Sequence, residues 1–581
     1  MKRITLLLVG ILCLPIFSFS GGIVTNQNQS AAYIRMFARD ASTDIDAVFF
    51  NPAGLTKLDD GFYLSLNYQY INQNKVVTND YVHFGGTNEY VGEVNVPIFP
   101  GLYAAYKKGK FAVSFGVNPV GGGGSAVFDE GLPSFEKSVS DLVPGLSGLS
   151  ALGTQAGVDL DVTGYNYDAY LDGSSVFWGF QAGASYEIND MFSVYLGGRF
   201  VYAKNTYEGY LKDIQVENEG TYMDATDFIN LKAIPTIDGT VSNLNGIIAI
   251  PNNIQPIIEG GGGSLTLPQA RDMGYISTEQ YEGIIAGLSA VGVTDPATYT
   301  IQATSSTITG ATPSLEANIT ELQTNRAVLE ATAAVVADQE GDIVQTGTGF
   351  APVIGIHITP NDKLSIGLKY EFQTKLELEN DVKDGNGFLI GFQDDGVTPR
   401  YLYNDGDKFR NDMPAMLSAG IDYKLTEKLS VATGFHMYFD KSADYGRKLY
   451  DAQLDESFPV DNDEVIDRNS TEFAFGLEYQ LNAKLLLSIG YLNTQTGVSE
   501  DYQTDLSYSQ HSNTLGFGGA YAVTSGINMN VGIGYTVYND ARKIYEVQDP
   551  SGQMQVTTEE YDKDNLFVAF GLDFKFGEKS E

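Results

Sequence analysis

The sequence predicts an all-β fold, a 14-stranded antiparallel barrel that spans a membrane. Three observations lead to this prediction: apolar and polar residues alternate in fourteen segments, every second connection between the segments is tight, and the only long apolar run lies at the N-terminus. Alternation places one row of side chains on each face of a strand, and in a membrane barrel the apolar row faces lipid. After the N-terminal run, no stretch reaches the roughly 20 apolar residues of a membrane-spanning helix.

The first twenty residues have the pattern of a secretory signal peptide. Lys2 and Arg3 are followed by an apolar run that extends to Phe17, and Ser20 ends a segment suited to cleavage. An uncleaved membrane anchor would need a longer apolar run. We therefore predict export of the chain and removal of residues 1–20.

The composition excludes several classes of function. Without Lys2 and Arg3 the chain carries 33 basic and 73 acidic side chains, a net charge of −40. Such a surface repels phosphate backbones, so nucleic acid is not an expected partner. The only cysteine, Cys13, lies in the predicted signal peptide. The exported chain would then have no thiol for a disulfide, for redox chemistry or for binding a metal.

The alternating segments are the predicted strands. In the first of them Phe62, Leu64 and Leu66 share one face, whereas Ser65 and Asn67 share the other. The fourteen predicted strands are residues 61–74, 97–107, 110–120, 175–187, 191–206, 349–359, 363–379, 412–424, 428–441, 470–481, 484–496, 511–523, 527–540 and 564–576.

The lengths of the connections favour a membrane barrel over a soluble β-sandwich. The tight connections are residues 107–109, 189–190, 360–362, 426–427, 482–483 and 524–525. Short turns on the periplasmic side and long loops outside are typical of outer-membrane barrels, and an even number of strands places both termini in the periplasm. A sandwich would bury the same apolar face as its core, but it has no reason to alternate its loop lengths in this way.

Aromatic residues mark the edges of the predicted membrane region. Tyr186, Tyr423, Tyr479 and Tyr521 each stand just before a tight turn, at the depth where an apolar ring with a polar hydroxyl is favoured. The last strand alternates strictly and ends on Phe576. This ending resembles the signal by which the barrel assembly machinery recognises its clients, so we expect that machinery as a partner during biogenesis.

Two connections are longer than a barrel needs, namely residues 121–174 and 208–348. The first has a helix-like pattern over 135–152. The second has helical patterns over 278–291 and 314–337, which flank glycine- and threonine-rich coil. Loops of this length are usually functional or disordered. We predict that they form a partly helical extracellular cap.

A short motif precedes the first strand: Asn51, Pro52, Ala53, Gly54 and Leu55. With the Asp-Ala-Ser before it, this motif resembles the N-terminal hatch of the FadL/TodX family, outer-membrane transporters of long-chain fatty acids and hydrophobic hydrocarbons. The resemblance implies a signal peptide (1–20), a hatch (21–58) that plugs the lumen, and a barrel (59–581) in the outer membrane of a Gram-negative bacterium. The alternative is a turn that leads from a periplasmic tail into the sheet.

The resemblance also implies a route. Loops capture the substrate, an apolar lumen pocket receives it, and it leaves sideways through the wall at a kink in the third strand. Pro119 cannot donate a ladder hydrogen bond, and Gly121, Gly122, Gly123 and Gly124 weaken pairing, so this stretch is the candidate for the kink. The alternative is a strand that simply ends in a loop. The function predicted is passive import of hydrophobic molecules, long-chain fatty acids first.

A fatty carboxylate would favour a cation in the lumen. Strand parity points four cations inward, and the hatch adds two; the candidate contacts are Arg199, Lys369, His357, His436, Arg35 and Arg39. The alternative is that these cations pair with lumen carboxylates such as Glu371, Asp422 or Glu478.

Two rival functions stay open: a water-filled diffusion porin, and an adhesin or receptor that acts through its large loops. Catalysis is not expected, because His511, Ser512 and Asn513 are adjacent strand residues that point to opposite faces. We expect no cofactor and no metal. Besides the hydrophobic substrate, the expected partners are outer-membrane lipid and lipopolysaccharide, and the chain is expected to be a monomer.

Overall fold

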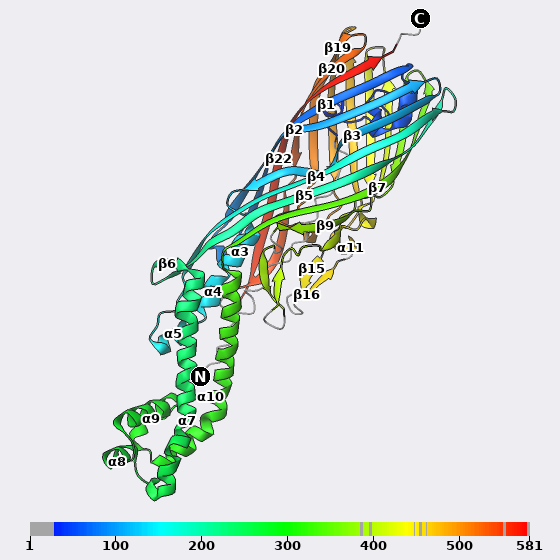
Figure 1. Ribbon diagram of the computed structural model, residues 1–581. Coiled ribbons are helices and arrows are strands. Elements are labelled where there is room, and N and C mark those ends of the chain that lie inside the picture. Colours follow the sequence, from blue (N-terminus) through cyan, green and yellow to red (C-terminus); the bar gives the residue numbers. More distant parts are fainter. Residues whose placement is uncertain are drawn as a thin grey trace.

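The computed structural model describes residues 28–383, 387–393, 398–446, 448–451, 456–460, 462–549 and 553–577. It contains a closed antiparallel barrel of fourteen long strands, which confirms the predicted fold (Figure 1). The barrel closes where the first strand pairs with the last, from Phe62 opposite Phe576 to Asn79 opposite Glu559. The predicted signal peptide, residues 1–20, lies outside the described residues.

Each strand of the wall overlaps one predicted strand. The wall consists of β1 (Gly61–Asn79), β2 (Asn88–Lys108), β3 (Phe111–Phe128), β4 (Gly164–Glu187), β5 (Phe192–Asn218), β7 (Gln339–Asn361), β8 (Leu364–Glu371), β13 (Met416–Lys424), β14 (Leu429–Tyr438), β17 (Ser470–Gln480), β18 (Leu485–Gln495), β19 (Ser512–Thr524), β20 (Ile527–Tyr538) and β22 (Met554–Phe576). Four short strands lengthen this sheet at its edge: β6 (Thr221–Asp224), β9 (Glu377–Val382), β12 (Lys408–Arg410) and β21 (Ala541–Gln548).

The two faces of the wall have the predicted character. On β1, Phe62, Leu66 and Tyr68 are about 40% exposed on the outer face, whereas Ser65 and Asn67 are almost fully buried on the inner face. The tyrosines before the tight turns also point outward and are about two-fifths exposed; they are Tyr186, Tyr423, Tyr479 and Tyr521. The apolar belt therefore faces lipid, and the polar row faces the lumen.

Several wall strands are longer than predicted, and one is interrupted. β4, β5 and β7 have 24, 27 and 23 residues, so they continue past the apolar belt and shorten both predicted insertions. The strand predicted over 363–379 is two strands, β8 and β9. Five residues between them face four residues of β7, because Val353 pairs with Glu371 and Thr348 pairs with Glu377. This extra residue makes a bulge that divides the strand.

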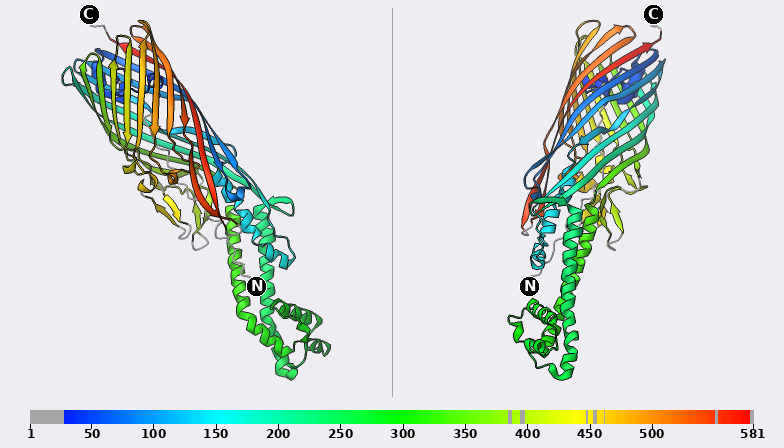
Figure 2. Two further views of the ribbon diagram at one scale, coloured as in Figure 1. Left: turned by 180° about the vertical axis from the view of Figure 1, so that it is seen from behind. Right: turned by 60° about the vertical axis from the view of Figure 1, so that its left-hand side comes forward.

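The short turns lie at one end of the barrel, here called the turn end, together with Gly61 and Phe576. The long connections lie at the other, here called the loop end (Figure 2). The connection between β3 and β4 forms three short helices: α3 (Pro133–Ser140), α4 (Leu142–Ser147) and α5 (Ser150–Ala156). They overlap the range predicted to be helical, 135–152, but extend past both of its ends and form three separate helices.

A helical hairpin projects from the loop end, built from α7 (Ile234–Ile257) and α10 (Ile301–Val335), with α8 (Leu267–Asp272) and α9 (Thr278–Ala290) at its tip (Figure 1). The sequence patterns predicted no helix over the range of α7. Pro251 and Pro256 lower the helix propensity of this segment, but Ile250 and Ile254 pack into the apolar core of the tip. No helix within the described parts of the chain has both the length and the hydropathy needed to cross a membrane.

The N-terminal segment lies inside the barrel, near the turn end (Figure 1). It forms α1 (Ala31–Arg35), α2 (Ala47–Phe50) and the 3-10 helix η2 (Pro52–Lys57). Its apolar side chains share one cluster with inward-facing residues of the wall, for example Tyr63 and Tyr103. Residues 28–58 are called the inner segment below.

Candidate functional site

The inner segment fills the lumen with aromatic side chains. The ring of Tyr33 stacks on Phe50 with centroids 5.2 Å apart and meets the edge of Phe37 at 5.1 Å, and Phe49 meets Phe50 at 5.1 Å. All four residues are at most 3% exposed. Such aromatic contacts add to the free energy gained by burying the rings, so the segment is a packed body rather than a loose tail.

Glycines at the middle of the wall strands allow this packing. A Cβ built on Gly516 would lie 2.1 Å from the carbonyl oxygen of Ile34, and one on Gly367 would lie 2.0 Å from that of Asp40. Glycine is the residue that permits such a close approach between two backbones. The recurring mid-strand glycine was visible in the sequence, and it is the signal that could have predicted this contact surface.

The Asn51 to Leu55 motif turns the chain toward β1 and ties it to the wall. The Asn51 side chain accepts a hydrogen bond from the Ala53 backbone at 3.4 Å and donates one to the Ile356 carbonyl at 2.9 Å. Pro52 begins η2, where its missing N–H costs nothing. The Ser185 hydroxyl donates to the Pro52 carbonyl at 2.6 Å. The motif is therefore held by β4 and β7 at once.

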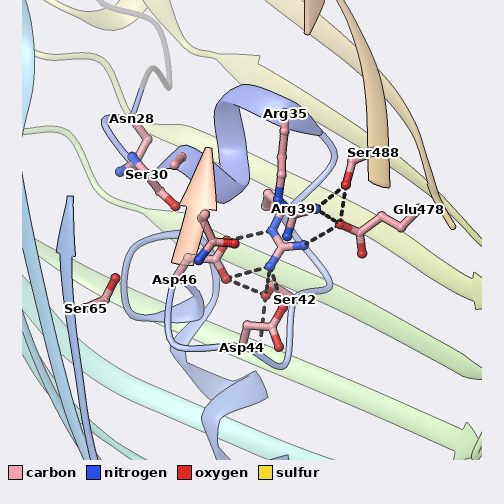
Figure 3. A network of polar contacts seen from close by, with 12 residues as sticks. Asn28, Ser30, Arg35, Arg39, Ser42, Asp44, Asp46, Ser65, Glu478 and Ser488 are labelled. Carbon is pink, nitrogen blue, oxygen red and sulfur yellow. Dashed lines mark hydrogen bonds and ion pairs between the residues drawn. The ribbon is translucent and has the colours of Figure 1, made fainter. Parts of the chain in front are cut away.

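Two of the predicted cations hold the inner segment in place (Figure 3). Arg35 donates hydrogen bonds to Glu478 and Ser488 of the wall. Arg39 is bound to Asp46 at 2.6 Å and to Asp44 at 2.7 Å within the segment itself. Burial alone would lower the pKa of Arg39, but the carboxylates of Asp46 and Asp44 raise that pKa well above its usual value. Arg39 is thus a permanently charged centre of the inner segment.

The other four predicted cations face the lumen and are buried. Arg199 donates to Glu371 and, at 2.7 Å, to the Gln181 side chain. The Lys369 ammonium donates to the Phe49 carbonyl at 3.1 Å and lies 3.8 Å from Glu371. Arg199, Glu371 and Lys369 therefore form one group at the contact between the wall and the inner segment.

The two histidines differ. His436 lies between Asp40 of the inner segment and Glu472 of the wall, 2.9 Å from each carboxylate. His357 lies beside Gly54, and neither of its ring nitrogens has a hydrogen-bond partner among the described residues. Five of the six predicted substrate contacts therefore already have carboxylate neighbours. Pairing of these cations with carboxylates was the alternative given in the sequence analysis. A role for any of the six in binding substrate stays a prediction.

The pairing of β2 with β3 breaks in the middle of the wall. Leu102 pairs with Val117, and the next partners along the two strands are Glu93 and Val127. The register gives no β2–β3 partners to residues 94–101 and 118–126, although both stretches are part of the described chain.

The candidate kink borders this break, inside β3 rather than after it. Pro119 pairs with Trp178 of β4 and Gly124 with Ser175, so β3 carries two extra residues here. Gly122 has a φ of +89°, and a Cβ on it would lie 2.2 Å from the Ser175 carbonyl oxygen. Only glycine fits this position. The inner segment reaches the same place, because the Gln29 side chain donates to the Pro119 carbonyl at 3.3 Å.

An apolar lining connects the break with the lumen. Val120 and Phe177, which flank the kink, belong to the same buried cluster as the inner segment. The cluster continues toward the loop end through Leu492 and Phe567, with Ile71 packed against it. A hydrophobic molecule in the lumen would therefore meet apolar side chains from the loop half of the barrel to the break in its wall.

Two further lumen cations were not predicted. Lys75 of β1 and Lys563 of β22 stand directly opposite each other on the closing seam. Both are half-buried and, by strand parity, on the inner face. A single lysine in a polar lumen row looks ordinary in the sequence, and only the pairing of the first strand with the last brings these two together.

Comparisons with known proteins agree with this architecture. Residues 296–576 match the model of the family described as outer membrane protein transport protein (OMPP1/FadL/TodX). This range begins before α10 and contains the wall strands from β7 to β22. No curated protein sequence matches the chain.

The crystal structure of a FadL homologue from Pseudomonas aeruginosa aligns with 96% of this chain and 100% of its own, with a TM-score of 0.53 and 12% identity. The toluene transporter TodX of Pseudomonas putida aligns over 95% of this chain and 99% of its own, with a TM-score of 0.48 and 12% identity. The toluene transporter TbuX of Ralstonia pickettii aligns over 92% and 94%, with a TM-score of 0.41 and 14% identity. The first of these shares the fold, and together with the family match over residues 296–576 it supports a place for the chain among the OMPP1/FadL/TodX outer membrane transport proteins.

Proposed function

We propose that the protein passively imports hydrophobic molecules, long-chain fatty acids first, from the outside of the cell into the outer membrane. The molecule is captured at the loop end, enters the apolar lumen, and leaves sideways between β2 and β3 into the membrane. The loop end is then extracellular and the turn end periplasmic. No chemical step and no cofactor are needed, because the molecule is moved but not changed.

The observation that carries this proposal is the break in pairing between β2 and β3, which is lined by the same apolar cluster as the lumen. A hydrophobic molecule gains roughly 0.8 kcal/mol for each methylene that it transfers from water into lipid. A lateral exit transfers the molecule directly into lipid, so it does not have to cross the periplasmic water first.

The inner segment acts as a hatch in this proposal. Its aromatic residues are fully packed, and its ion pairs join it to the wall, so it obstructs a straight aqueous path. This arrangement counts against the diffusion porin, which needs an open, water-filled lumen. With the hatch in place, the route to the side is the one that the packing leaves for a hydrophobic molecule.

The proposal is tested by uptake into cells. Cells that lack the gene should take up radiolabelled oleate several times more slowly than wild-type cells, and the full-length chain should restore the rate. Toluene uptake, measured in the same strains, decides between fatty acids and aromatic hydrocarbons, since two of the similar solved structures are named toluene transporters. Unchanged oleate and toluene uptake in the deletion strain would refute the proposed function.

The helical hairpin offers a test of the rival receptor function. Its base packs in one apolar cluster with α4 and β5, while its tip has a core of its own. Replacing residues 243–320 by a short glycine linker keeps the base and the Asp238–Arg326 ion pair. We expect this variant to insert and to take up oleate at the wild-type rate. Loss of uptake would show that the tip belongs to the transport route, and loss of cell adhesion alone would support the receptor.

A further inference from the structure

A cavity of about 470 Å³ lies at the loop end of the wall, and its volume is in the range of small-molecule binding sites. It is bordered by the connection between β18 and β19 and by the turn from β20 into β21. None of the described residues that line it belongs to the apolar cluster of the lumen and the inner segment. The proposed transport route therefore leaves this cavity unused.

A bulge between β20 and β21 opens the space for this cavity. Val537 pairs with Asp564 and Ala541 pairs with Tyr561, so three residues of the chain face two residues of β22. The extra residue bends the strand locally. Asn539 stands at this bend and lines the cavity.

Hydrogen bonds between lining residues fix the shape of the cavity. The Gln510 side chain donates to the carbonyl of Asn539 at 2.9 Å and to that of Tyr561 at 2.7 Å. The Gln503 side chain accepts from the Ser509 backbone at 2.9 Å and donates to the Ser509 carbonyl at 2.8 Å. Both glutamines are 4% exposed. The cavity is thus formed before a ligand arrives, which reduces the conformational entropy lost on binding.

Several polar atoms of the lining residues are left without partners. The Gln510 Oε1 and the Ser499 hydroxyl are buried, and neither has a hydrogen-bond partner among the described residues. Buried polar atoms are normally paired, so each of these requires a ligand or a water molecule. The His511 Nδ1 accepts a hydrogen bond from the Thr496 backbone at 3.1 Å, which leaves the proton on Nε2 as a further donor. Burial and the Arg468 guanidinium lower the pKa of His511, so its ring is neutral at neutral pH.

Charged side chains of both signs also line the cavity. Arg542 and Glu560 are paired across β21 and β22, and both are exposed on the outer face of the wall. Together with Glu500 and Asp540, they give the cavity three carboxylates and one guanidinium. Within the described parts of the chain, none of these four side chains forms a hydrogen bond or an ion pair. They are therefore available to a ligand.

The lining selects the chemical class of this ligand. Its excess of carboxylates repels an anion such as phosphate. An apolar molecule would remove water from the polar groups without replacing their hydrogen bonds. Among the described residues, no group of histidine, cysteine, aspartate and glutamate side chains is arranged to hold a metal ion. Donors and acceptors side by side match a sugar, because each sugar hydroxyl both donates and accepts.

We propose that this cavity binds a sugar through Arg542, Glu560 and the unpartnered polar atoms around them, a function separate from the import of hydrophobic molecules. The sugar is free in solution or is a unit of the lipopolysaccharide that surrounds an outer-membrane barrel. The outward row of β20 changes from apolar to polar here, from Val537 to Asn539. The cavity therefore lies where the apolar belt ends on this strand, at the level where saccharide chains meet the wall.

The test is isothermal titration calorimetry on the full-length protein in a nonionic detergent. The probes are glucose, inorganic phosphate, and the core oligosaccharide of lipopolysaccharide freed of its lipid and phosphate groups. Wild-type protein should bind at least one of the two sugars and should not bind phosphate. Tighter binding of the oligosaccharide would identify lipopolysaccharide as the source of the sugar, and equal or tighter binding of glucose would identify free sugar.

Two variants test the residues of the cavity. R542Q/E560Q keeps the net charge, and its affinity for the sugar should fall about tenfold or more, because hydrogen bonds to charged groups contribute more than neutral ones. N539W should abolish binding, since a large ring at this exposed position fills the cavity. Heat-modifiable migration in gels, which reports a folded barrel, is expected for both variants, because all three side chains are exposed.

A matched control removes one charge of each sign at the opposite end of the barrel. Glu427 and Lys428 are exposed in the short turn between β13 and β14, and E427Q/K428Q should bind sugar like the wild type. Binding of neither sugar by the wild type, or binding of phosphate instead, would refute the sugar site. A folded R542Q/E560Q variant with wild-type affinity would refute it as well. Oleate uptake should be unchanged in every variant, so refutation of the sugar site leaves the proposed import standing.

Discussion

A chain that lacks Gly122 and Gly123 is expected to insert into the membrane but to lose fatty-acid uptake by about tenfold or more, because opening a continuous strand ladder within lipid costs several kcal/mol per unsatisfied group. From Pro119 to Gly124, β3 advances two residues more than its partner β4. Removing two residues restores the one-to-one register and leaves the inward and outward faces where they are. The deletion should therefore remove the kink from β3. Seven residues of β3 would then lie opposite eight of β2, a one-residue mismatch that a single bulge accommodates.

The control for this deletion removes two other glycines. Gly85 and Gly86 lie in the connection between β1 and β2, where both are exposed and a Cβ would meet nothing within 4 Å. This second deletion should leave uptake of labelled oleate unchanged. A folded Gly122–Gly123 deletion that transports at the wild-type rate would show that the molecule does not leave by this route.

The second large effect concerns the inner segment, the proposed hatch. Replacing Arg39 by Met leaves Asp46 buried without its cation, and breaking a buried ion pair on one side costs about 3–5 kcal/mol. Arg39 is 3% exposed and binds both Asp46 and Asp44, so the cost falls on the inner segment itself. The R39M variant should therefore release the segment from its packed state, and its barrel should conduct ions in a planar bilayer as a water-filled pore does.

A double variant separates the lost charge from the lost shape. In R39M/D46N the buried carboxylate is neutralised, and the charge that remains on Asp44 is 68% exposed to solvent. The amide can still accept the hydrogen bond that Ser42 donates to Asp46 at 2.6 Å. We expect its conductance to fall well below that of R39M. Conductance of R39M as low as that of the wild type would mean that these ion pairs do not hold the hatch.

The barrel itself was predictable from the sequence, because each strand carries its own signal. Strand alternation and tight turns are local patterns, and all fourteen wall strands overlap a predicted segment. The ends of β4, β5 and β7 were less predictable. There the strands leave the apolar belt. On β5 the outward residues become polar while Leu211, Ile214 and Val216 pack inward, so the pattern that marks a strand in lipid does not continue.

The partners of the lumen side chains could not be predicted in the same way. Parity correctly placed Arg199, Lys369, His357 and His436 on the inner face. It could not show that Asp40 of the inner segment would reach His436, because that contact joins residues almost 400 positions apart. The helix α7 was missed for a similar reason: its prolines argue against a helix locally, and its packing in the tip of the hairpin decides otherwise.

The pair of Lys75 and Lys563 is a second contact that the sequence could not predict. Lys75 and Lys563 are separated by almost the whole barrel in sequence, and they meet only because β1 closes on β22. Neither residue carries a motif. Neither lysine forms an ion pair within the described part of the chain, and only the structure can show this.

The claim on which everything else depends is that a hydrophobic molecule leaves the lumen between β2 and β3. The most direct measurement is photo-crosslinking of intact cells with a diazirine-bearing fatty acid, followed by mass spectrometry of the labelled peptides. Labelling of Ile98, Val120 and Phe177, which border the break or line the lumen beside it, is the result expected from this route. Labels confined to the end of the inner segment beside the short turns, for example at Leu55 and Lys57, would show that the molecule passes straight down the barrel instead.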